Sequence, residues 1–126
     1  MENEDVTLIA KGNLFGSGAE GLEKENVVIT NSEDWNTLMA QMDAVNKVSE
    51  RFAETEIDFA EYTVIAVFDE VKSSGGHHIE LEIIQNSEAL VVYIKYLAPR
   101  GIATTMMTQP FYIVKLPKQD SSVLFK

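Results

Sequence analysis

The stretch Tyr62-Thr63-Val64-Ile65-Ala66-Val67-Phe68 is a continuous apolar run bounded by the acids Glu61 and Asp69. Its β-branched and aromatic residues favour an extended strand, and it shows no alternation of apolar with charged residues. A strand of this kind is buried on both faces, which places it inside a sheet. The run therefore predicts a central strand around which the rest of the chain is arranged.

The sequence after this run predicts a β-hairpin. Ile79, Leu81 and Ile83 alternate with glutamates, so one face of that strand is expected to be buried and the other wet. A turn at 86–88 then leads into a second alternating stretch, Ala89 to Leu97. Two antiparallel strands joined in this way extend the sheet.

Four shorter stretches predict the remaining strands. Proline is tolerated at the first residue of a strand, so Pro110 marks the start of one, which runs from Phe111 to Leu116. The others are Thr7 to Ala10, Asn26 to Thr30 and Val123 to Phe125.

One amphipathic helix is expected between the second of these strands and the central run. Trp35, Leu38, Met39 and Met42 follow one another at i, i+3, i+4 and i+7, which puts them on one face. Asn31 or Ser32 can cap its first turn. The segment around Val45, Val48 and Phe52 fits either a second short helix or a packed loop. We predict an α+β fold: a mainly antiparallel curved sheet of about six strands with one amphipathic helix packed on it.

Composition limits the function classes. The chain has 126 residues, 45% of them hydrophobic, which is ordinary for one globular domain spanning 1–126 with an acidic lead at residues 1–5. It has no cysteine, and its net charge is −10. Residues 1–62 hold fourteen acids and four bases, whereas residues 63–126 hold six of each. An anionic surface repels phosphate groups, so we expect no nucleic-acid partner; no apolar run is long enough for membrane insertion.

Ser73, Ser74, His77 and His78 are the residues closest to a catalytic or metal-binding set. Together with Asp69 they include the residue types of a nucleophile, base and orienter. However, neighbouring strand residues point to opposite faces, and a metal site needs three or four convergent ligands. We therefore predict no catalytic residues, no metal ligands and no cofactor. A small-molecule, metal-binding or hydrolytic site centred on His77 and His78 is the alternative, and a protease inhibitor is a third possibility.

The loop Ser73-Ser74-Gly75-Gly76 is the most informative connection. It is first of all a glycine-permitted turn between two strands. Its bare backbone would also let a partner chain approach closely, together with the connection from Pro99 to Pro110. The residues predicted to contact a protein partner are Ser73, Ser74, Gly75, Gly76, Pro99, Arg100, Gln109 and Pro110.

The order of these segments resembles the PrcB C-terminal domain family. The resemblance is carried by Val64 to Phe68, Lys72 to Leu81, Leu90 to Ile94, Pro99 and Thr108 to Pro117, with Val28 to Trp35 upstream. The Ser-Gly-Gly loop combined with the Gln-Pro strand start is its specific part.

This resemblance implies a non-catalytic bacterial accessory domain. The family is named for a component that stabilises a cell-surface protease complex, and its members are often secreted or lipid-anchored. It therefore implies a cell-envelope or secreted location and a protein partner, although the given chain shows no signal segment ahead of Met1-Glu2-Asn3-Glu4-Asp5.

Overall fold

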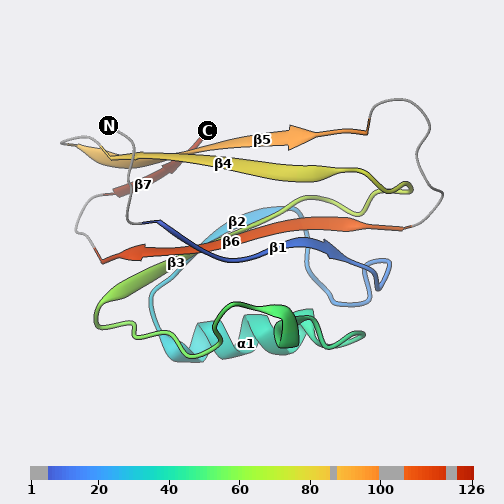
Figure 1. The fold of residues 1–126 in the computed structure, drawn as a ribbon, viewed down its shortest axis with the longest axis horizontal. Helices are drawn as coiled ribbons and strands as arrows, with labels where there is room; N and C mark the ends of the chain where they lie inside the picture. The colour runs from blue at the N-terminus through green and yellow to red at the C-terminus, as the bar shows by residue number, and fades with distance from the viewer. Residues whose placement is uncertain (1–5, 86–87, 100–106, 119–121) are drawn as a thin grey trace.

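The computed structural model describes residues 6–85, 88–99, 107–118 and 122–126. Within them the chain forms β1 (Thr7–Leu14), β2 (Glu25–Ile29), α1 (Ser32–Met42), the 3₁₀ turn η1 (Val48–Arg51), β3 (Tyr62–Phe68), β4 (His78–Gln85), β5 (Ala89–Leu97), β6 (Gln109–Pro117) and β7 (Ser122–Phe125). Figure 1 shows three layers: the sheet containing β4, β5 and β7, the sheet containing β1, β6, β3 and β2, and α1 beneath the second sheet.

The larger sheet has the strand order β1-β6-β3-β2, and all its neighbours are antiparallel. The apolar run from Tyr62 to Phe68 is β3, and it lies inside this sheet as predicted. The smaller sheet has the order β4-β5-β7, in which β5 pairs antiparallel with β4 and parallel with β7. The predicted hairpin is therefore confirmed.

Successive side chains of β3 enter two different cores. Val64, Ala66 and Phe68 face the helix, where they pack in a cluster with Trp35 and other apolar residues. Ile65 and Val67 face the other way, into a cluster formed with β4, β5 and β6. Strand β6 is divided in the same manner, because Ile113 belongs to the first cluster while Val114 and Leu116 belong to the second. The two internal strands thus join the layers.

Helix α1 begins where the sequence predicts. The Asn31 side chain accepts a hydrogen bond from the Asp34 backbone N–H at 2.8 Å, so Asn31 is the cap, and Glu33 and Asp34 lie in the positive first turn. Three of the four predicted apolar positions, Trp35, Leu38 and Met42, are buried, whereas Met39 is partly buried at the margin of the core.

The α+β class is confirmed, with one difference in how the strands are arranged. Seven strands form in the described residues, and they divide between two sheets instead of forming one curved sheet. The physical reason lies in β3 and β6: both are apolar on both faces, and α1 covers only one face. The sheet made from β4, β5 and β7 covers the other.

Two local boundaries also differ from the sequence prediction. Strand β1 continues through Gly12 to Leu14, beyond the predicted end at Ala10. Gln109 precedes Pro110 as the first residue of β6.

Trp35 is the side chain on which the attachment of α1 depends most. It is 1% exposed, its ring lies 6.1 Å from that of Phe52, and its Nε1–H donates to the Thr55 carbonyl at 2.8 Å. Replacing Trp35 by Ala should lower the free energy of unfolding by about 3 to 5 kcal/mol, because it leaves a large cavity. Trp35→Phe should lose less, because a ring still packs on Phe52. Urea unfolding of both variants measures this; a loss below about 1 kcal/mol for Trp35→Ala would contradict the packing.

Candidate partner-binding surface

The loop predicted to contact a partner lies between β3 and β4. A two-residue bridge closes it, in which the backbone groups of Lys72 and Thr108 exchange hydrogen bonds of 2.6 and 2.9 Å. Ser73 and Gly76 are exposed, Ser74 is half-buried and Gly75 is buried. The bare backbone predicted at both glycines is therefore accessible to solvent only at Gly76.

Gly76 and Pro99, two of the predicted residues, lie against each other. Gly76 has a φ of +86°, a conformation that favours glycine, and a Cβ built on it would lie 2.6 Å from the Pro99 Cβ. No larger side chain fits without movement of Pro99. The loop and the end of β5 are thus brought together by close packing.

Thr108, just before β6, and Gln109, the first residue of β6, form side-chain hydrogen bonds near the loop. The Thr108 hydroxyl donates to the Ser74 carbonyl at 2.8 Å. The Gln109 side chain is 1% exposed, and its Nε2 donates to the carbonyls of Leu22 at 2.8 Å and Asp69 at 3.1 Å. Its Oε1 has no hydrogen-bond partner among the described residues.

Of the predicted partner-binding residues that the structure describes, three are buried: Gly75, Gln109 and Pro110. The Gln109 amide donates to the carbonyls of Leu22 and Asp69 inside the protein. Arg100 lies outside the described residues. Ser73, Ser74, Gly76 and Pro99 remain together at the surface.

A charged cluster that the sequence did not indicate lies beside the loop. The Asp69 carboxylate is buried, and one of its oxygens lies 3.8 Å from the Lys24 Nζ while the other lies 3.8 Å from the Lys72 Nζ. Lys24 also lies over the Tyr96 ring, 4.2 Å from its centroid. Burial, and then the negative charge of Asp69, raise the pKa of Tyr96 above its ordinary value. In the sequence, the only indication of this cluster is that an acid directly follows a buried strand, and this does not identify either lysine.

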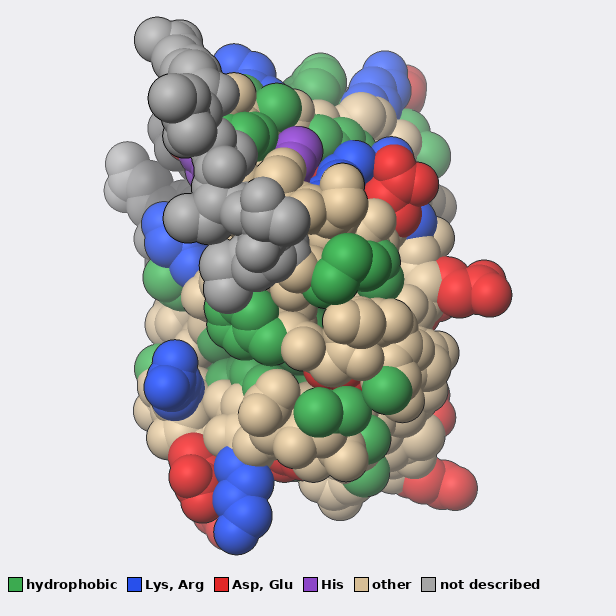
Figure 2. All heavy atoms as spheres, turned by 90° about the vertical axis from the view of Figure 1, so that its right-hand side faces the viewer, with side chains coloured by type: hydrophobic (Ala, Val, Ile, Leu, Met, Phe, Trp, Pro, Cys, Tyr) green, Lys and Arg blue, Asp and Glu red, His purple; other side chains and the backbone are tan. Residues whose placement is uncertain are grey.

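Two exposed apolar side chains lie near these residues in the sequence. Tyr96 on β5 is 39% exposed and Met107, just before β6, is 43% exposed. We name Ser73, Ser74, Gly76, Tyr96, Pro99 and Met107 the end surface. Figure 2 views this end of the molecule and shows hydrophobic side chains in its central area, with the charged side chains mainly around the margin.

The two histidines have different partners. His77 Nε2 lies 3.1 Å from the Ser74 hydroxyl, whereas His78 is exposed and its Nε2 lies 3.9 Å from a Glu80 carboxylate oxygen. The pairing of His78 with Glu80 agrees with the strand geometry, in which residues i and i+2 share a face. Across the described residues, no group of three or more histidine, aspartate or glutamate side chains is placed to hold a metal ion.

Tyr96 predicts a specific loss of stability at high pH. Between the ordinary value of 10.0 and the raised pKa of Tyr96, the unfolded chain loses the phenolic proton while the folded chain keeps it. The free energy of unfolding should therefore fall as the pH rises above about 10. Tyr96→Phe should weaken this fall, whereas Tyr93→Phe, on the other face of the same strand, should leave it unchanged. Denaturant unfolding at several pH values tests this; identical pH curves for wild type and Tyr96→Phe would contradict the assignment.

Comparison with known proteins gives one match. No curated protein sequence and no solved structure matches the chain significantly. The sequence model of the family described as PrcB C-terminal matches residues 63–117, from β3 through β6. This segment contains the whole end surface and the hairpin of β4 and β5. The resemblance found in the sequence is thereby confirmed over residues 63–117, the segment that the PrcB C-terminal family model matches.

Proposed function

We propose that this chain is a non-catalytic accessory module of the bacterial cell envelope, which binds another protein and stabilises a surface complex such as a protease complex. One observation carries the proposal: every residue of the end surface falls within the segment that matches the PrcB C-terminal family. The family name associates that segment with a protease complex, and the end surface is where a partner would bind.

The end surface has the properties of a protein contact. Its loop is locked by Gly76 against Pro99 and by the hydrogen bond from Thr108 to Ser74, so little conformational entropy is lost on binding. Tyr96 and Met107 add an aromatic and a methionine side chain, both of which are enriched in protein interfaces. Methionine also repacks readily against different surfaces.

The proposed location follows from the family alone. Among the described residues, no helix is long and apolar enough to cross a membrane. The net charge of −10 disfavours contact with nucleic acid, so a protein is the partner that we propose.

Site-specific photo-crosslinking in cells of the native host tests this proposal. A photoreactive phenylalanine analogue at Ser73 should give a crosslinked protein band that mass spectrometry identifies as an envelope protein. The same analogue at Leu124, an exposed apolar position on β7, is the matched control and should give no such band. Absence of a Ser73 product, or the same product from both positions, would contradict the end surface as the binding site.

One contact favours a second candidate function. Ser74 Oγ and His77 Nε2 lie 3.1 Å apart, the arrangement of a nucleophile and its base, so a hydrolytic site is the alternative. A fluorophosphonate probe should label wild type and not Ser74→Ala if that alternative holds. We expect no labelling of either protein, because no carboxylate among the described residues contacts the His77 ring to orient it.

A further inference from the structure

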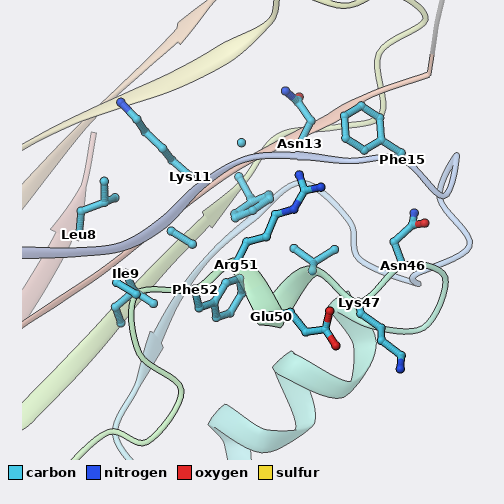
Figure 3. Close-up of a pocket in the computed structure, with 15 residues that line it drawn as sticks. Leu8, Ile9, Lys11, Asn13, Phe15, Asn46, Lys47, Glu50, Arg51 and Phe52 are labelled. Carbon is cyan, nitrogen blue, oxygen red and sulfur yellow. The ribbon is translucent and has the colours of Figure 1, made fainter.

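A cleft lies along the outer edge of β1. It has a volume of about 910 Å³, and its walls are the segment from Leu8 to Phe15, which is β1 with the residue after it, and the segment 46–53 that contains η1. Figure 3 shows both walls, with β1 above and η1 below. The residues that line the cleft come from 8–15 and 46–53, together with Phe111, and none of the end-surface residues lines it.

The edge of β1 is only partly covered. β1 is the first strand in the order β1-β6-β3-β2, so its outer backbone groups have no strand neighbour. The Ile9 carbonyl accepts from the Ala53 N–H at 2.9 Å, and a bulge interrupts the pairing between Leu8 and Ala10. From Lys11 to Leu14 no other described residue forms a backbone hydrogen bond with the outer edge. This half of the strand is open to pairing with another chain.

The floor of the open half is apolar. Gly12 has no side chain, and the nearest atoms to a Cβ built there would be those of the Phe111 ring, at 3.9 Å. The ring is therefore reached from the cleft, which Phe111 also lines. Phe15 adds a second aromatic side chain at one end, 48% exposed. An apolar side chain of a bound segment would fit beside Gly12.

The walls of the cleft carry more basic than acidic side chains in an anionic protein, since three bases and one acid, Glu50, line it. Three of the four bases in residues 1–62, Lys11, Lys47 and Arg51, line it. Figure 3 shows the Arg51 side chain extended toward β1, with Lys11 and Lys47 directed away from the centre on opposite walls. The Arg51 guanidinium has no ion pair or hydrogen bond with any described residue. A guanidinium offers five donors in a planar fork that matches a carboxylate.

The length of the cleft favours an extended segment over a small molecule. At about 3.3 Å per residue, the eight residues of β1 from Thr7 to Leu14 extend over roughly 23 Å. A small carboxylate would satisfy Arg51 and leave most of the open edge unpaired. A strand with alternating side chains would pair with the backbone, direct one set toward Gly12 and place acids near the cations.

From these observations we infer that the β1 cleft binds an extended acidic segment of another protein, which adds to the sheet as a strand beside β1. This goes beyond the proposed function, because it assigns a second site with its own partner chemistry. Arg51 pairs with a carboxylate of the segment, and an apolar residue of the segment packs over Gly12 onto Phe111.

Fluorescence polarisation with defined peptides tests this inference. The probe is a labelled peptide of eight residues, the length of β1, with alternating glutamate and valine. It should bind saturably, whereas a peptide of alternating lysine and valine should not. The glutamate peptide with N-methyl groups on alternate backbone nitrogens should also fail, because it cannot form the ladder. No saturation of the first peptide up to about 1 mM, or equal binding of the N-methylated peptide, would overturn the inference.

Two charge-reversal variants locate the binding. Arg51→Glu should weaken binding of the glutamate peptide at least about tenfold. Lys118→Glu, which changes the net charge equally on an exposed residue after β6, should leave it within about twofold. Equal effects of the two variants would show that only overall charge matters and would overturn the assignment. Neither variant should change crosslinking at Ser73, which separates this test from that of the proposed function.

Backbone protection and self-association give independent readouts. In the wild-type protein, the glutamate peptide should slow amide hydrogen exchange in the segment from Lys11 to Leu14, which strand addition covers. Sedimentation over a range of protein concentrations tests whether a second copy occupies the edge instead. Concentration-dependent dimers that Arg51→Glu abolishes would assign the cleft to that second copy and contradict an acidic peptide partner.

Discussion

The burial of β3 on both faces is the constraint on which the rest of this fold depends. Residues next to each other in the chain, such as Ala66 and Val67, lie in different hydrophobic clusters. One sheet and one helix could not cover both sets, so a third layer is required. Because β6 is apolar on both faces as well and pairs with the whole of β3, the two strands form the shared wall between the two cores.

Patterns among neighbouring residues were enough to predict the helix and the strands, but the arrangement of the strands depends on contacts between residues distant in the sequence. The β-branched run of β3, the alternation in β4 and the Asn31 cap are set by neighbouring residues, and each is found in the structure. An alternating pattern shows which face of a strand is buried but not which strand lies beside it. The division into two sheets, and the parallel pairing of β5 with the distant β7, therefore could not be read from the pattern.

The structure changes the roles that the sequence suggested for several residues of the predicted partner-binding surface. Gly76 and Pro99 were predicted to contact a partner, and the structure shows that they pack against each other. Gln109, as a polar residue, was placed with them, but its carbonyl partners belong to Leu22 and Asp69, which are far away in the chain. The cleft beside β1 gave no sequence signal, because it exists only where Gly12 and Arg51 are brought near each other by folding.

The buried amide of Gln109 also discriminates between alternative pairings of the strands. Apolar contacts tolerate small displacements, because one methyl group can replace another. The amide instead requires two particular carbonyl oxygens, from residues 22 and 69, within reach of one nitrogen. A shift of β6 by one residue would remove the amide from both oxygens and leave polar groups without partners in a dry interior. This side chain therefore raises the free energy of misaligned strand pairings relative to the native state, and it does so next to the loop that we propose to contact a partner.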